Sequence, residues 1–186
     1  NPLVQWEEQR QANIGLDITT FNRRLDINLD VYEKTTDKLY NQINLSAVTG
    51  SFGIQGNNGK LQNRGVELNV KYKAIKSENF NLNFYANTSY NKSEIKDMVT
   101  PDITGANRNV IGGPVYQWFL SPYLGVNQSN GNSLFQTASG AISESLNADV
   151  DGVATGKTPF PDWQGGFGLN SDYKGFYLNT HFTYQQ

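Results

Sequence analysis

Two short segments of this chain come close to known ligand-binding loops, and both lack a required part. Gly152-Val153-Ala154-Thr155-Gly156-Lys157-Thr158 has the outline of a phosphate-binding loop, but three residues separate its glycines where that motif has four. Pro159 and Pro161 also prevent the helix whose N-terminus would hold the phosphate. Asp149-Val150-Asp151-Gly152 has the outline of a calcium loop, but Thr158 stands where the bidentate acidic ligand belongs. We expect neither segment to bind its ligand.

The sequence also shows no combination of residues that suggests a catalytic site. His181 is the only histidine and there is no cysteine, so the usual zinc sites cannot be built. No acidic residue near His181 in the sequence suggests a triad. Asp26 and Asp30 share one face of a predicted strand, where a solvated wall explains them better than acid–base chemistry. We predict that the chain is not an enzyme and that it binds no metal and no cofactor.

Most of the remaining pattern is a strict alternation of apolar and polar residues. A period of two predicts β-strands, because successive side chains of a strand point to opposite faces. Within these stretches one face carries apolar, aromatic or small residues and no charge or amide, and the other is rich in Asn, Asp and Lys. The predicted strands are Ala12 to Thr20, Leu25 to Val31, Val66 to Ala74, Phe80 to Tyr90, Trp163 to Tyr173 and Phe176 to Tyr184.

Composition restricts the class of protein further. The 186 residues begin at Asn1 without a methionine and stop at Gln186 within an alternating run, so we expect a piece of a longer protein. No stretch of about 18 apolar residues is present, which excludes a transmembrane helix but not the half-polar strands of a membrane barrel. The net charge of −2 argues against a nucleic-acid partner.

The connections between the predicted strands alternate between short and long. Tight turns at 21–24, 76–79 and 174–175 alternate with long segments at about 37–64 and 92–162, an order expected for an outer-membrane barrel with large external loops. Aromatic residues lie near both ends of the strands, and nine residues tilted by about 40° rise roughly 23 Å, close to the apolar band of such barrels. We therefore predict that residues 1–186 form part of one transmembrane β-barrel domain.

The chain also resembles a known family in four blocks that keep the family's order. They are NPLVQWEEQRQANIGLDITTFNRRLDINLDVYEKTTDKLY, GKLQNRGVELNV, GGPVYQWFLSPYLGV and TPFPDWQGGFGLNSDYKGFYLNTHF. Together they are similar to the late barrel of SusC/RagA-type TonB-dependent transporters of Bacteroidetes. The resemblance implies an all-β, antiparallel barrel of about 22 strands in the Gram-negative outer membrane, of which six are present. It also implies import of glycans, peptides or similar solutes, energised by the TonB complex through a missing N-terminal part.

The resemblance further implies a SusD-like surface lipoprotein as partner, and the apolar strand face implies contact with outer-membrane lipid. The polar face would line the barrel lumen, with wall residues Asp17, Asp26, Asn28, Asp30, Glu67, Asn69, Lys71, Asn81, Asn83, Asn87, Asn170, Asn179 and His181. In the longest loop, Trp118, Phe119 and Tyr123 belong to an aromatic run that suits a folded-in loop, a partner contact or a ligand platform. The alternative is a secreted all-β carbohydrate-binding or adhesin-type module, whose apolar face would be a shared core.

Overall fold

The computed structural model describes residues 4–46, 48, 50, 53–100, 102–104, 106–147 and 151–186. The regular elements bounded within these residues are β-strands. They fall into two compact units: a wall unit (Glu7–Asp37, Leu61–Ser93, Phe160–Gln186) and a loop unit (Asn1–Trp6, Lys38–Lys60, Glu94–Pro159). Over the described residues, the structure has no helix with the length and apolar character needed to cross a membrane.

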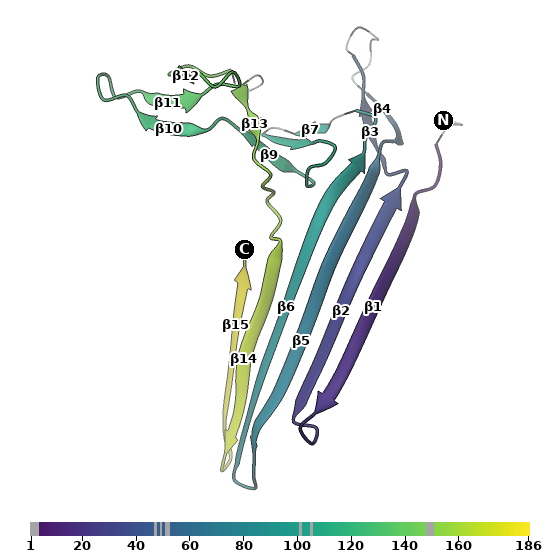
Figure 1. Ribbon diagram of the computed structural model, residues 1–186, viewed down its shortest axis with the longest axis vertical. Coiled ribbons are helices and arrows are strands. Elements are labelled where there is room, and N and C mark those ends of the chain that lie inside the picture. The colour runs from purple at the N-terminus through teal and green to yellow at the C-terminus, as the bar shows by residue number, and fades with distance from the viewer. Residues whose placement is uncertain are drawn as a thin grey trace. The chain divides into compact units, whose positions relative to one another are not determined.

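Six long strands form one antiparallel sheet, in which each strand lies beside its neighbours in chain order (Figure 1). They are β1 (Glu8–Thr20), β2 (Leu25–Asp37), β5 (Lys60–Lys76), β6 (Phe80–Asp97), β14 (Trp163–Tyr173) and β15 (Phe176–Gln185). These are the six strands that the alternation predicts. The prediction of an all-β, antiparallel arrangement is therefore confirmed.

The turns that join these strands in pairs are tight. Between β14 and β15, Lys174 and Gly175 have φ of 47° and 89°, the two positive values that suit a two-residue hairpin on a right-twisted strand pair. Between β5 and β6, the backbone N–H of Ser77 donates to the carbonyl of Phe80 at 3.0 Å. Three consecutive residues of the β1–β2 turn, Phe21 to Arg23, also have positive φ. Each turn leaves little chain between its two strands.

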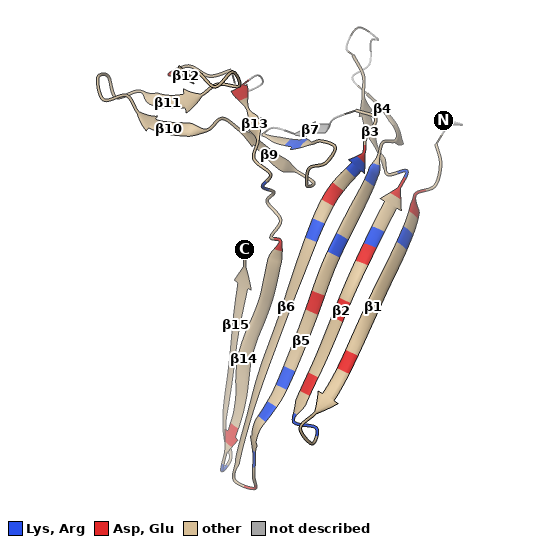
Figure 2. Cartoon of the chain, in the orientation of Figure 1, with Lys and Arg blue, Asp and Glu red and all other residues tan. Residues whose placement is uncertain are grey.

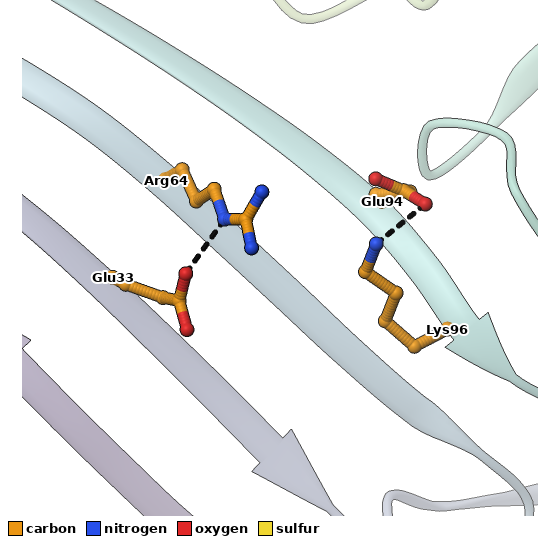
Figure 3. Close-up of polar contacts among 4 residues, drawn as sticks. All are labelled: Glu33, Arg64, Glu94 and Lys96. Atoms are coloured by element: carbon orange, nitrogen blue, oxygen red, sulfur yellow. Dashed lines mark hydrogen bonds and ion pairs between the residues drawn. The ribbon is translucent and has the colours of Figure 1, made fainter.

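Five strands extend beyond the alternating stretches that predicted them, β15 by a single residue. β2 continues through Glu33-Lys34-Thr35-Thr36-Asp37, where both faces carry polar residues, so a period of two no longer marks the strand. Charged residues are concentrated on β1, β2, β5 and β6, whereas β14 and β15 are almost free of them (Figure 2). Ion pairs occur on the extensions: Glu33 with Arg64 and, in the loop unit, Glu94 with Lys96, both at 2.6 Å (Figure 3).

The cross-strand register gathers the apolar residues of the sheet on one face. Leu16 of β1 lies opposite Leu29 of β2, which lies opposite Leu68 of β5. In the other half, Phe167 lies opposite Ala86 and Phe182, and its ring stacks on that of Phe182 with centroids 5.3 Å apart. Within the described residues of the wall unit, no second layer covers this face. Ile14 is 79% exposed, and the only buried apolar side chain among the described residues is Ile95.

The two long connections contain short strands. They are β3 (Tyr40–Asn44), β4 (Gly53–Asn57), β7 (Asp102–Thr104), β8 (Asn107–Asn109), β9 (Gln117–Leu120), β10 (Tyr123–Val126), β11 (Ser133–Gln136), β12 (Ile142–Ser143) and β13 (Val153–Ala154). They form a β3–β4 hairpin, a β13–β9–β8–β7 sheet and a β10–β11–β12 sheet. The buried polar residues Asn58, Asn109 and Gln117 all carry amides. Asn58, for example, accepts from the N–H groups of Val99 and Thr100 at 2.8 and 3.2 Å, which satisfies its buried oxygen.

Candidate functional site

The predicted wall residues of β1, β2 and β5 share the polar face of the sheet and form cross-strand rows. Asp17, Asn28 and Asn69 lie in one row, and the Asn28 amide donates to Asp17 Oδ1 at 2.5 Å. Asp26 lies opposite Lys71 and accepts a hydrogen bond from the hydroxyl of Thr19 at 2.8 Å. This half of the face therefore presents carboxylates held by neighbouring amide, hydroxyl and ammonium groups.

One row of this half brings two carboxylates directly opposite each other, Asp30 on β2 and Glu67 on β5. Like charges in that position repel, which destabilises a strand pair. On the other side of Asp30 the partner is Gly15, where an added Cβ would lie 2.7 Å from Asp30 Oδ1. The Asp30 carboxylate thus leans over Gly15 and away from Glu67. The absence of a side chain at Gly15 makes room for it.

The half of the polar face on β6, β14 and β15 is built mostly from neutral groups, although Asp172 of β14 adds a carboxylate. Asn83, Asn170 and Asn179 form one row across the three strands, and Asn81 lies opposite Asp172. The side-chain oxygen of Asn87 accepts from the backbone N–H of Gly166 at 2.7 Å. The predicted wall residues thus divide into a charged half and an amide half.

Tyr85 and His181 form the most specific side-chain contact of the amide half. Their rings stack with centroids 5.8 Å apart and planes at 13°. The Tyr85 hydroxyl donates to the carbonyl of Thr180 at 2.9 Å and lies 3.3 Å from His181 Nδ1. Gly168 lies between them in the register, and a Cβ there would come within 2.5 Å of the Tyr85 oxygen. His181 is predicted from the sequence but Tyr85 is not, because an aromatic residue in a polar register looks like a break in the pattern.

Tyr32 was missed for the same reason. It stands in the polar register of β2, opposite Gly65 of β5, and its ring occupies the space where a side chain on Gly65 would be. Its hydroxyl donates to Asn91 Oδ1 at 3.1 Å. Each of these two tyrosines lies opposite a glycine of the adjacent strand, an arrangement that the strand register shows and the sequence pattern alone does not.

Four of the predicted wall residues, Glu67, Asn69, Asn87 and His181, line a single open hollow of about 390 Å³ on the polar face. Its other walls come from β6, β14 and β15: Thr88, Ser89, Gln164, Gly165, Gly166, Thr183, Tyr184 and Gln185. The remaining predicted wall residues lie on the same face outside this hollow. The hollow offers amide, hydroxyl, imidazole and carboxylate groups, so it suits a hydrophilic solute with many hydrogen-bonding groups.

The structure divides the three predicted loop aromatics between two sheets. Trp118 and Phe119 belong to β9, and the Arg108 guanidinium lies 4.5 Å from the centre of the Phe119 ring. Tyr123 belongs to β10 and packs edge-on against Phe135 of β11, with centroids 5.7 Å apart. Tyr123 is 59% exposed, whereas Phe119 is half-buried. Phe119 therefore fits the folded-in reading, and Tyr123 offers the more accessible ring.

The segment that resembled a phosphate loop forms part of a sheet. Val153 and Ala154 make β13, which pairs with β9. The N–H and hydroxyl of Thr155 both donate to the carbonyl of Trp118, at 3.0 and 2.8 Å, and the N–H of Lys157 donates to the Thr155 hydroxyl. Those backbone donors are thus engaged within the protein. Asp149 and Val150 of the calcium-like segment lie outside the described residues.

Glu144 is the centre of a polar cluster in the loop unit. The side-chain amides of Asn132, Asn130 and Asn127 all donate to its carboxylate, with the Asn132 contact at 2.7 Å. Hydrogen bonds to the charged form favour it, so these amides, Asn132 first, lower the pKa of Glu144. The cluster fastens the turn after β10 to the chain beyond β12.

The sequence and the fold both resemble those of known proteins, and these similarities identify the family. All 186 residues match the family described as TonB dependent receptor-like, beta-barrel. The chain belongs to this family, and its six-stranded sheet is a segment of the family's barrel. This confirms the resemblance to SusC/RagA-type proteins. The match is to a family of transporters rather than of enzymes.

Individual relatives agree with this assignment. TonB-dependent receptor P39 of Formosa agariphila is 38% identical over 97 residues, which are 52% of this chain and 9% of the relative. Receptor P3 of the same organism is 27% identical over 98% of the chain and 20% of its own length. SusC of Bacteroides thetaiotaomicron is 31% identical over 55% of the chain and 10% of its length. The chain thus spans a fifth or less of these relatives.

Solved structures give the same answer. The structure of the RagAB peptide transporter matches all of this chain with a TM-score of 0.89 and 28% identity, and the matched part is 22% of the solved chain. The RagAB peptide importer in the 'open-open' state matches with a TM-score of 0.88. The arrangement of strands seen here is therefore that of a barrel segment in a larger protein.

Proposed function

We propose that the protein containing this chain is an outer-membrane, TonB-dependent importer of hydrophilic oligomers, peptides or glycans. The observation that carries the proposal is the uncovered apolar face of a single-layer sheet, with the exposed Ile14 as its clearest member. A secreted module would pack such a face against a second sheet. In a membrane, contact with lipid keeps such an apolar face away from water without a second layer of protein.

Aromatic pairs at the two ends of the apolar face support the membrane setting. Phe80 and Tyr173 pair at one end with ring centroids 6.1 Å apart, and Tyr90 and Trp163 pair at the other at 4.9 Å. From Phe80 to Tyr90 the strand spans ten residue steps, which at a tilt of about 40° rise about 25 Å. That height matches the apolar band of an outer-membrane barrel, with amphipathic rings at both boundaries.

The polar face would then line the solute path, and the predicted wall residues would contact the solute in passing. The hollow beside Glu67, Asn69 and His181 is open, so its hydrogen-bonding groups favour transient contact over tight binding. Both peptide amides and sugar hydroxyls suit those groups. The similarity to the RagAB peptide transporter supports peptides as the solute. Because the chain is also similar to SusC, we retain glycans as the second class of solute.

The partners follow from the same family membership. Energy would come from the TonB complex, and a SusD-like surface lipoprotein would cover the outer mouth of the barrel. In the loop unit, Tyr123 and Leu124 of β10 are exposed and are the residues we assign to partner or solute contact. Phe119 is half-buried with Arg108 against its ring, so Tyr123 is the more accessible ring for such a contact.

Uptake by whole cells tests the proposal. Cells that produce the full-length protein should accumulate labelled oligopeptides or oligosaccharides, and a proton uncoupler should abolish the accumulation. The double substitution of Glu67→Gln with Asn69→Ala should change uptake several-fold, while Asn81→Ala, on the same face outside the hollow, should not. Accumulation that persists without the proton gradient, or a full-length protein that stays soluble without detergent, would disprove the importer.

A further inference from the structure

The apolar face of the wall unit holds an apolar groove that ends at a cluster of charges. Its lining includes Ala12 and Ile14 of β1, Val31 of β2, Val66 of β5 and Tyr90 of β6. Nearly all of the surface that it exposes is apolar. Its lining lies in two adjacent cross-strand rows, one of Ala12, Glu33 and Arg64 and the other of Ile14, Val31 and Val66, so the groove crosses β1, β2 and β5.

The groove ends at the ion pair between Glu33 and Arg64, which stand in the same register as Ala12. Arg64 Nε donates to Glu33 Oε2 at 2.6 Å, and this is the only hydrogen bond of Arg64 within the described residues. Figure 3 shows both terminal nitrogens of Arg64 on the side of the guanidinium away from Glu33. The N–H groups of those nitrogens can therefore donate to an acceptor outside the protein. The Arg64 side chain is 61% exposed, so such an acceptor can reach it.

The charge at this end of the groove is positive. Lys92 follows Tyr90 by two residues on β6 and so lies on the same face. Arg64 and Lys92 together outweigh Glu33 by one unit of charge. The next charges along β1 largely cancel each other, since Arg10 Nη2 lies 3.8 Å from Glu8 Oε2. An apolar groove with a net cationic end matches a molecule that has an acyl chain and an anionic headgroup.

We propose that this groove binds one anionic lipid of the surrounding membrane, with an acyl chain against Ile14, Val31 and Val66 and a headgroup phosphate at Arg64. The terminal N–H groups of the guanidinium are suited to a phosphate in two-point contact. Tyr90 closes the groove on the side of β6 and brings an amphipathic ring to the level of the headgroup. The proposal depends on the membrane placement given above but not on transport.

Native mass spectrometry of the purified full-length protein tests the site, with phosphatidylglycerol and phosphatidylcholine titrated separately in a neutral detergent. The wild type should retain phosphatidylglycerol more strongly. Arg64→Gln should weaken that binding about tenfold, the factor that the loss of a hydrogen bond to a charged group implies. Lys34→Gln is the matched control, because Lys34 adjoins Glu33 on β2 but points to the opposite face.

A second variant keeps the test decisive if Arg64→Gln does not fold. Ala12→Phe fills the groove and leaves both charges in place, so it should reduce lipid binding with no loss of folded protein. Equal binding of the two lipids overturns the proposal, as does equal loss in Arg64→Gln and Lys34→Gln. So does a wild type that carries no lipid and instead forms concentration-dependent dimers. Energy-dependent uptake is measured separately, so failure of the lipid site and failure of the importer remain distinguishable.

Discussion

A lysine placed on either face of β2 distinguishes a lipid-facing surface from a solvent-facing one. Leu29 lies between Leu16 and Leu68 on the apolar face, about two residue steps inside the Val31 end of the band. Asn28, its neighbour in the chain, lies on the polar face and donates to Asp17. Leu29→Lys and Asn28→Lys thus add the same charge at nearly the same depth, on opposite faces.

The expected difference is large. A lysine at the centre of the lipid-facing band costs about 2–4 kcal/mol, and the cost falls to about 0–1 kcal/mol near the boundaries. Leu29 lies between the two, so we expect roughly 2 kcal/mol for Leu29→Lys. Asn28→Lys should cost less than about 1 kcal/mol, because its ammonium stays in water beside the Asp17 carboxylate. The difference corresponds to a change of roughly fivefold or more in the folding equilibrium.

The assay is urea-dependent folding of the full-length protein into lipid vesicles, followed by tryptophan fluorescence and by heat-modifiable migration on gels. Leu29→Met serves as the packing control and should cost less than about 1.5 kcal/mol, because it nearly conserves side-chain volume. If Asn28→Lys is as damaging as Leu29→Lys, the assignment of the two faces is wrong.

Two further predictions concern side-chain contacts on the polar face and in the loop unit. Gly65→Ala should destabilise the full-length protein by about 1–3 kcal/mol in the same assay, because its methyl group would overlap the Tyr32 ring, and the added substitution Tyr32→Ala should recover part of that loss. Asn132→Ala should raise the pKa of Glu144 toward its ordinary value in carboxyl NMR of glutamate-labelled protein, with Glu144→Gln to assign the signal. Because the pKa of Glu144 is lowered in the folded protein, its stabilising contribution is present above the ordinary carboxyl pKa and is lost as the pH falls through the lowered value. An unchanged Glu144 signal in Asn132→Ala would contradict the first cause assigned to the shift.

The six long strands could be predicted from the sequence because each of their faces meets a uniform environment. Where one face is apolar and the other polar, a period of two is visible in a single strand without knowledge of its neighbours. At the ends of β2 and β5 both faces are mostly polar, so the pattern disappears while the backbone pairing continues from Glu33 opposite Arg64 to Thr36 opposite Leu61. The predicted ends of these strands were short for that reason.

The details of the candidate site could not be predicted because they depend on register. The stack of Tyr85 on His181 requires that β6 and β15 lie on either side of Gly168 in β14, which sequence alternation does not specify.

The positions of the loop aromatics could not be predicted from the sequence either. Phe119 and Tyr123 are close in sequence, but β9 ends at Leu120 and β10 begins at Tyr123, so the two rings serve different sheets.

The stability of this sheet must come from outside the described chain. Ile95 is the one buried apolar side chain among its described residues, so there is no core whose burial would offset the conformational entropy lost on folding. The outer edges of β1 and β15 have no partner strand within the described residues. In lipid, every unpaired backbone group of such an edge costs several kcal/mol. Both the apolar face and the two edges therefore require a closed barrel in a membrane, which makes the barrel rather than this segment the unit that folds.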